Sequence, residues 1–185
     1  QMKRNTDLDF IRAILIVLMI LIHIVSFGNA YPHLKAGILS FMMPTFLIIT
    51  GYLVNIEKTG RQMGNYLKCL ALPYVIMVTG FSVLSYYMPV RDGITELSLS
   101  QICEKIFVTS IGPYWFIQTM IICGTLYYFC FRGRNWNDLR KNYTKRDTYA
   151  SLFVFALTLL LISETPALSA SAAAYYFIGV VIRQS

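Results

Sequence analysis

An arginine and a histidine stand eleven positions apart in the first apolar stretch of the chain, Arg12 and His23. At about 3.6 residues per turn, eleven residues make roughly three whole turns of a helix, so the two side chains are expected about 20° apart around its axis. At about 1.5 Å per residue they are expected roughly 16 Å apart along that axis. Ionisable groups in apolar segments are costly and usually line a cavity or a substrate path. The pair is therefore the first candidate for chemistry, with a cation near one end of the helix and a base near the other.

Each candidate residue also has a purely structural interpretation. Arg12 can extend its guanidinium to the lipid headgroups, as basic residues at helix ends do, and His23 can be a contact residue between helices. Thr50 with Gly51 can form a packing notch, and Trp115 can be an anchor in an aromatic belt. The shared helix face of Arg12 and His23 is what favours a functional role for these two.

The composition of the chain is typical of a membrane protein. Of its 185 residues, 56% are hydrophobic and only 14% are charged, whereas a soluble domain carries about a quarter charged residues. Thirteen Tyr and twelve Phe fit the aromatic belts at a membrane surface. The net charge of +7 is concentrated in a few short loops, which indicates topology signals rather than a surface for nucleic acid. We therefore predict an all-α, polytopic transmembrane helical bundle that contacts membrane lipid and no nucleic acid.

A hydrocarbon core about 30 Å thick requires about 20 apolar residues per helix. Five to six such stretches form one predicted transmembrane domain over residues 1–185, and they lie near 10–27, 36–54, 66–88, 111–131, 149–163 and 167–182. The last is rich in Ala and Ser, which suit close packing of helices, and a polar segment ending at Lys105 separates the third from the fourth. Most Lys and Arg residues fall on the side of the N-terminus, so the positive-inside rule predicts a cytoplasmic N-terminus. Arg12 is then expected at the inner face and His23 in the outer half of the membrane.

The four cysteines give no sign of a metal centre. Cys69, Cys103, Cys123 and Cys130 form no CxxC pair and have no histidine pair near them in the sequence. Structural and catalytic metal sites need such clusters of ligands, so no metal is expected.

Four short motifs, in order along the chain, resemble the integral-membrane acyltransferase-3 family. The first is residues 8–13 (LDFIRA) followed by His23. Residues 44–53 (PTFLIITGYL) are similar to the family's Phe-Phe-x-x-Ser-Gly-Tyr/Phe-Leu motif, with threonine where serine is usual. Residues 70–74 (LALPY) also fit the family, and residues 112–117 (GPYWFI) resemble its Gly-x-x-Trp-Phe-Leu signature at the start of a later helix.

The resemblance implies transfer of an acyl group, commonly acetyl, from a cytoplasmic acyl-CoA to a hydroxyl of a carbohydrate, a lipid-linked sugar or another cell-surface molecule. It implies acetyl-CoA or another acyl-CoA as co-substrate, no bound cofactor, and a location in the bacterial inner membrane. It also carries over Arg12 and His23 as the functional pair of the first helix. A neutral imidazole is a suitable base for a hydroxyl proton, and a transient acyl-histidine is an alternative role for His23.

The remaining candidates surround this pair in the expected mechanism. Arg61 and Lys68 are expected to join Arg12 in binding the anionic head of the acyl donor, because all three belong to the same inner layer. The candidates for a pocket or an oxyanion donor are the polar and aromatic intramembrane residues Thr50, Tyr52, Trp115 and Gln118.

Two departures from the family pattern leave alternatives open. The family usually has an arginine pair before the proline of the third helix, where this chain has Tyr66, Lys68 and Cys69. The family fold also has more helices than this chain, so we expect an N-terminal portion of such an enzyme. A small transporter or proton-linked permease, with His23 as a relay group, is one alternative. A catalytically incomplete membrane partner, active with a second subunit or as a homo-oligomer, is another.

Overall fold

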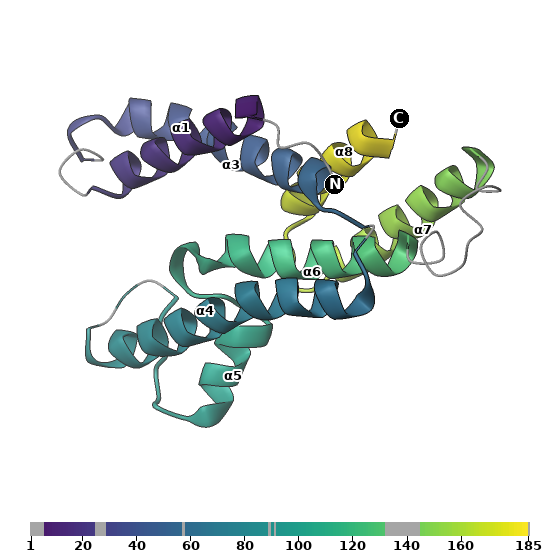
Figure 1. The fold of residues 1–185 in the computed structure, drawn as a ribbon. Helices are drawn as coiled ribbons and strands as arrows, with labels where there is room; N and C mark the ends of the chain where they lie inside the picture. Colours follow the sequence, from purple (N-terminus) through teal and green to yellow (C-terminus); the bar gives the residue numbers. More distant parts are fainter. Residues whose placement is uncertain are drawn as a thin grey trace. The chain divides into compact units, whose positions relative to one another are not determined.

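A computed structural model describes residues 6–24, 29–56, 58–88, 90, 92–131 and 145–184. The end of the first predicted span and most of the basic cluster that follows the fourth lie outside these residues. The described part of the chain is all-α and contains no strand, which confirms the predicted fold class (Figure 1). Its elements are α1 (Thr6–His23), α3 (Pro32–Leu53), α4 (Gly60–Tyr87), α5 (Leu99–Phe107), the 3₁₀ turn η1 (Gly112–Tyr114), α6 (Trp115–Phe131), α7 (Lys145–Ser163) and α8 (Ala170–Gln184).

Four described stretches are long and apolar enough to cross a membrane by length and composition, namely α3, α4, η1 with α6, and residues 146–163 of α7. The two other predicted spans are also helical. However, α1 carries Asp7, Asp9 and Arg12 in its first turns, and α8 is only 15 residues long. The chain is therefore a polytopic helical protein with at least these four candidate spans.

Helix α4 begins six positions before the predicted span. Its N-cap is Thr59, whose hydroxyl accepts from the backbone N–H of Gln62 while the Gln62 side chain accepts from the Thr59 N–H. This reciprocal arrangement is a capping box, which satisfies two backbone donors at a helix start. The signal is present in the sequence as Thr-x-x-Gln, but the hydropathy pattern alone places the start at the first long apolar run.

Helix α5 lies largely in the segment predicted as a polar connection between the third and fourth spans. Its N-cap is Ser98, whose hydroxyl accepts from the backbone N–H of Gln101. Helix α5 is amphipathic, with Ile102 and Ile106 half-buried and Leu99 and Phe107 highly exposed. At nine residues it is too short to span a bilayer, so a search for membrane-length apolar runs misses it.

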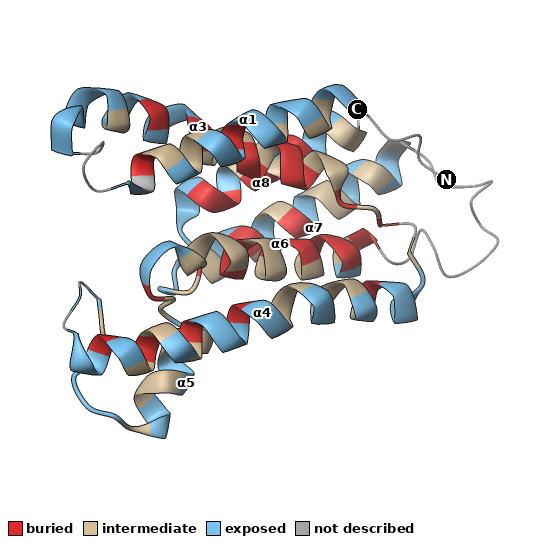
Figure 2. Cartoon of the chain, turned by 60° about the vertical axis from the view of Figure 1, so that its left-hand side comes forward, coloured by how far each residue is buried: buried red, intermediate tan, exposed pale blue. Residues whose placement is uncertain are grey.

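The chain divides into two compact units. The first comprises α1, α3 and residues 175–183 of α8, and within it α1 packs against α3. Figure 2 shows buried positions on the helices of this unit. A Cβ atom on Gly51 would overlap the carbonyl oxygen of Tyr176, and one on Gly179 would overlap the carbonyl oxygen of Ile48. The backbones of α3 and α8 therefore touch, as small residues permit at helix crossings in membranes.

The second unit contains α4, α5, η1, α6 and α7. Helix α4 packs against both α5 and α6, and α6 packs against α7. A buried cluster of Tyr74, Val78 and Ile111 lies between α4 and the start of α6. The ring of Tyr114 meets that of Phe81 edge to face, with 6.0 Å between the centroids. Gly112 has a φ of +58°, a left-handed conformation that glycine adopts without a steric penalty.

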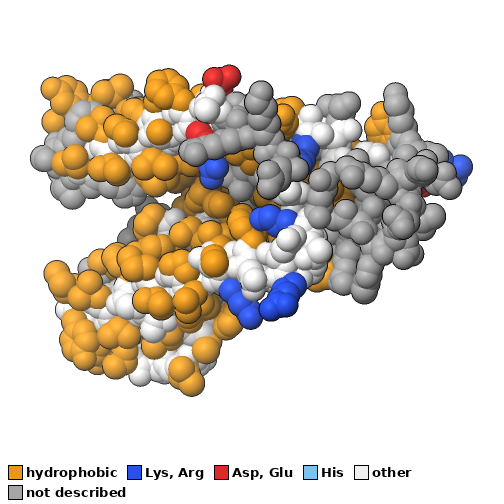
Figure 3. Space-filling model, in the orientation of Figure 1, with side chains coloured by type: hydrophobic (Ala, Val, Ile, Leu, Met, Phe, Trp, Pro, Cys, Tyr) orange, Lys and Arg blue, Asp and Glu red, His pale blue; other side chains and the backbone are white. Residues whose placement is uncertain are grey.

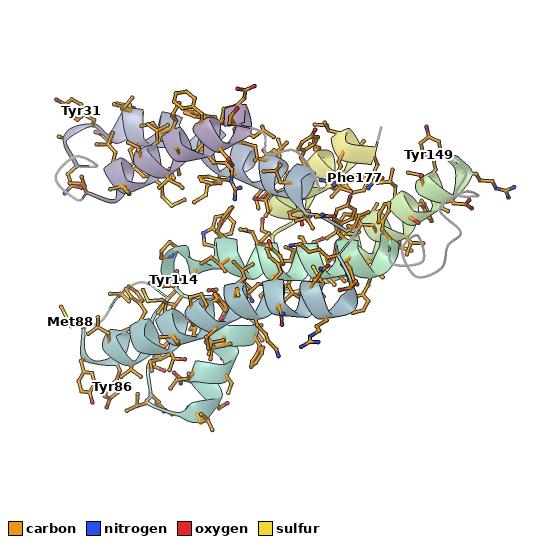
Figure 4. All side chains as sticks on the ribbon, viewed as in Figure 1. Tyr31, Tyr86, Met88, Tyr114, Tyr149 and Phe177 are labelled. Atoms are coloured by element: carbon orange, nitrogen blue, oxygen red, sulfur yellow. The ribbon has the colours of Figure 1, made fainter. Side chains whose placement is uncertain are left out.

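Exposed aromatic side chains mark the ends of several helices (Figure 4). Tyr31 precedes α3, Tyr86 and Tyr87 end α4, and Tyr149 lies in the first turns of α7. All four are largely exposed. Tyrosine is enriched at the boundary between lipid and water, where its ring is buried and its hydroxyl stays wet. These positions agree with helices that begin and end near a membrane surface.

Candidate functional site

Arg12 and His23 both belong to α1, eleven positions apart. Arg12 is half-buried and flanks the buried positions Leu15 and Ile22, whereas Phe10 and Val17 on the opposite side are about two-thirds exposed. The Arg12 side chain therefore leaves α1 at the edge of its packed face and not on its outward face. His23 is the last residue of α1, and its side chain lies outside the described part of the structure.

Thr50, Gly51 and Tyr52 lie at the C-terminal end of α3 in the first unit. The Thr50 side chain is buried, and its hydroxyl donates to the carbonyl of Phe46 at 2.7 Å. Gly51 is the packing notch against α8 described above, so the structural interpretation of this glycine is confirmed. The carbonyl of Tyr52 accepts from Nη1 of Arg183 at 2.7 Å, which satisfies one of the unpaired carbonyls at the end of the helix.

Arg61 and Lys68 lie in the first turns of α4 in the second unit, and both are exposed. Lys58 precedes them, with Nζ 4.2 Å from the ring centroid of Tyr66, a cation–π contact. The hydroxyl of Tyr128 donates to the carbonyl of Lys58 at 3.2 Å, which joins the start of α4 to the end of α6. Figure 3 shows Lys and Arg side chains beside the first half of α4, whereas its far end is covered by hydrophobic side chains. The cations are thus presented to solvent at one end of this helix.

Trp115 and Gln118 lie in the first turns of α6. Trp115 is half-buried, and its ring meets that of Phe116 with 6.2 Å between the centroids. Gln118 is buried, and its Nε2 donates to the carbonyls of Phe107 and Val108, at 3.2 Å and 3.3 Å. Gln118 therefore satisfies carbonyls at the C-terminal end of α5.

Tyr74 of α4 acts on the same end of α5. Its hydroxyl donates to the carbonyl of Ile106 at 2.8 Å. Together with Gln118 it binds three successive carbonyls, those of Ile106, Phe107 and Val108. Helix α5 is thus fixed to both α4 and α6 through the side chains of a tyrosine and a glutamine.

A cavity of about 160 Å³ adjoins this junction in the second unit. Its walls come from α4, α5 and α6, and they are lined by Ala71, Tyr74, Val75, Ile106, Phe107, Gln118, Ile121 and Ile122. The lining is almost entirely apolar. Of the predicted pocket residues, Gln118 lines this cavity, and Thr50, Tyr52 and Trp115 are not among its walls.

The sequence-predicted residues fall into two groups. Arg12, Thr50 and Tyr52 belong to the first unit with the backbone of His23, and Arg61, Lys68, Trp115 and Gln118 belong to the second. Two residues that make defined contacts, Tyr74 and Arg183, are not among the sequence-predicted site residues. Tyr74 lies in the LALPY motif, and Arg183 is one of the Lys and Arg residues that the positive-inside rule places on the side of the N-terminus. Within the described residues, no three His, Cys, Asp or Glu side chains come together as a metal site would require.

Comparison with known proteins adds a finding independent of this geometry. The family model described as "Acyltransferase domain" (Acyl_transf_3) matches residues 5–185. No curated protein and no solved structure matched the chain. The match covers nearly the whole chain and includes all four motifs that first suggested the resemblance. The chain therefore belongs to the acyltransferase-3 family.

Proposed function

We propose that the protein is an integral-membrane O-acyltransferase that moves an acyl group, most simply acetyl, from acyl-CoA to a hydroxyl of a carbohydrate or a lipid-linked sugar. The observation that carries the proposal is the placement of Arg12 and His23 on one helix, three turns apart, in a chain of this family. Membership of an acyltransferase family favours this function over the permease alternative. We further propose that the N-terminus is cytoplasmic and that the membrane is the bacterial inner membrane.

In the proposed reaction, cations bind the phosphate-rich head of the donor at the cytoplasmic side. Arg12 supplies a guanidinium suited to bidentate recognition of phosphate. Arg61 and Lys68 add exposed positive charge at the start of α4. With the head held there, the thin pantetheine arm extends along α1, and its thioester comes near His23, since roughly 16 Å separates the two positions along the helix.

His23 then acts as general base. Its neutral imidazole accepts the proton of the acceptor hydroxyl while the hydroxyl oxygen attacks the thioester carbonyl. The tetrahedral intermediate collapses as the C–S bond breaks, and the imidazolium returns the proton to the CoA thiolate. The ester product and the free CoA thiol result. The Thr50 hydroxyl and the Gln118 amide already donate to backbone carbonyls, and Tyr52 lies at the end of α3 that is remote from His23, so we propose none of these three as the donor to the intermediate's oxyanion.

The test uses inverted membrane vesicles that carry the protein in their membrane and enclose extracted cell-surface glycans. It measures the transfer of the acyl group from radiolabelled acetyl-CoA to these glycans. His23→Ala should lower kcat by at least about a hundredfold, because a positioned base contributes roughly 10²–10⁴-fold. His33→Ala is the matched control, since His33 is exposed in the first turn of α3, and it should keep full activity. Arg12→Gln should raise the KM for acyl-CoA more than it lowers kcat.

Equal amounts of inserted protein must be verified for each variant by membrane fractionation. Undiminished transfer by the His23→Ala protein would refute the general-base role. Solute flux through reconstituted protein without any acyl transfer would instead support the permease alternative.

A further inference from the structure

We propose that the cavity between α4, α5 and α6 is a binding site for the hydrocarbon end of a membrane-lipid acyl chain. The proposal concerns the second unit alone and does not depend on the acyl-transfer mechanism. It rests on the chemistry of the walls, the volume of the cavity and the nature of its rim.

The walls offer hydrocarbon and no charge. Six of the lining side chains are Ala, Val, Ile or Phe. The two polar ones, Tyr74 and Gln118, donate to the carbonyls at the end of α5. A polar ligand would have to lose its own hydrogen bonds to water without receiving these donors, at a cost of about 1–3 kcal/mol per group. A hydrocarbon chain loses nothing of this kind.

The volume fits the end of such a chain. At about 160 Å³ the cavity is close to an engineered apolar cavity of about 150 Å³ that stays empty of water and binds benzene. That comparison gives room for a segment of about six carbons. The cavity is therefore too small for a whole lipid and too apolar to be filled by water.

The rim points to the bilayer as the source of the chain. The cavity is partly open, and Val75 and Phe107 at its walls are 38% and 71% exposed. Leu72, next to the lining residue Ala71, is 65% exposed. Val75 belongs to α4, which is a candidate membrane span, so the exposed apolar rim on this helix meets lipid tails. A chain end enters from this side without crossing polar surface.

The experiment uses the purified full chain in nanodiscs that contain a phosphatidylethanolamine with a diazirine at the end of one acyl chain. After illumination, mass spectrometry locates the modified residues. Labelling should be concentrated on the cavity walls of α5 and α6, at Ile106, Phe107, Ile121 and Ile122. Phe153 and Leu160 of α7, 70% and 63% exposed and outside the cavity, measure the background from ordinary lipid contact.

A pair of variants separates occupancy of the cavity from general lipid contact. Ala71→Phe fills the cavity and should lower wall labelling about tenfold, because a filled cavity excludes the chain. Leu72→Phe introduces the same side chain one position away on the exposed side of α4 and should leave labelling within about twofold. If Ala71→Phe does not give a monodisperse, helical protein, Val75→Phe fills the cavity from the next turn.

Three results would overturn the proposal. One is labelling of the walls no stronger than that of Phe153 and Leu160. A second is wall labelling that persists when a well-folded variant fills the cavity. The third is labelling by a diazirine on the acyl chain of acyl-CoA but not by the phospholipid, which would assign the cavity to the enzyme's donor.

Discussion

The two units join their helices by opposite means. Helices α3 and α8 meet where Gly51 and Gly179 have no side chain, so that backbone lies against backbone. Helix α5 is held to α4 and α6 by two polar side chains, Tyr74 and Gln118, that bind its last carbonyls. The first join works by the absence of side-chain atoms and the second by hydrogen bonds.

The difference follows from what each helix end requires. In lipid there is little hydrophobic drive between helices, so association depends on close packing and on interhelical hydrogen bonds. Helix α8 is continuous at the crossing, and α3 reaches it in its last turn, where Arg183 binds the carbonyl of Tyr52. Helix α5 ends beside α4 and α6, and its last carbonyls have no partner within the helix. Only donors from neighbouring side chains can satisfy those carbonyls away from water.

The largest effect is expected at the glycine crossing. Gly179→Ala places a Cβ against the backbone of Ile48, and backbone cannot move aside as a side chain can. We expect a loss of about 1–3 kcal/mol in the free energy of unfolding, the usual cost of overpacking. Unfolding in mixed micelles measures it. Gly80→Ala is the control, since nothing lies within 4 Å of the Cβ it adds, and equal stability losses for both would contradict the close crossing.

The next effect tests the polar join. Gln118→Leu keeps a side chain of similar size but leaves the carbonyls of Phe107 and Val108 without their donor. The expected cost is about 1–2 kcal/mol. Hydrogen exchange of the backbone amides in α5 should rise, because the helix is released from α6. The α3 amides serve as the internal control. Unchanged exchange in α5 would mean that Gln118 does not hold this helix.

Arg183 tests whether the glycine join also depends on a hydrogen bond. Arg183→Met keeps the aliphatic stem but removes the guanidinium that binds the carbonyl of Tyr52. The expected loss of stability is about 1 kcal/mol, since the residue is only half-buried. Arg146→Met, exposed in the first turn of α7, is the comparison variant. A loss as large as that of Gly179→Ala would mean that the crossing depends as much on the hydrogen bond as on close packing.

The smallest effect is expected from Tyr74→Phe. It removes one donor to one carbonyl and keeps the ring in the cluster with Val78 and Ile111. We expect a loss of about 0.5–1 kcal/mol, smaller than for Gln118→Leu because only the Ile106 carbonyl is affected. Combining the two substitutions should give a non-additive loss if both donors hold the same helix end. Strict additivity in thermal unfolding would indicate two independent contacts.

Much of the fold could be predicted from local sequence patterns. The errors of that prediction have physical causes. The apolar runs of α3, α4 and α6 are long enough to be identified by hydropathy. Gly112-Pro113 correctly indicated where helical structure resumes after α5. The start of α4 was placed too late because its first turns are polar and its cap is a side-chain motif. Helix α5 was missed because a nine-residue helix gives no membrane-length signal.

The candidate site likewise has one part that could be predicted from the sequence and one part that could not. The spacing of Arg12 and His23 could be placed on one helix from the sequence, because helical periodicity is local. The hydrogen-bond partners of Gln118 and Arg183 could not, because these side chains bind carbonyls at the ends of other helices. Their roles as oxyanion donor, pocket wall or topology charge were open until those partners were identified.

By itself the sequence determined the helical class, the membrane-like composition, the order of the family motifs and the register of Arg12 with His23. These properties depend on composition and on residues within a few turns of one another. Only the tertiary structure decided that Gly51 meets α8 and that Gln118 and Tyr74 hold α5. Each of these contacts joins helices separated in the chain, and an apolar helix presents several faces that a sequence pattern cannot assign to a particular neighbour.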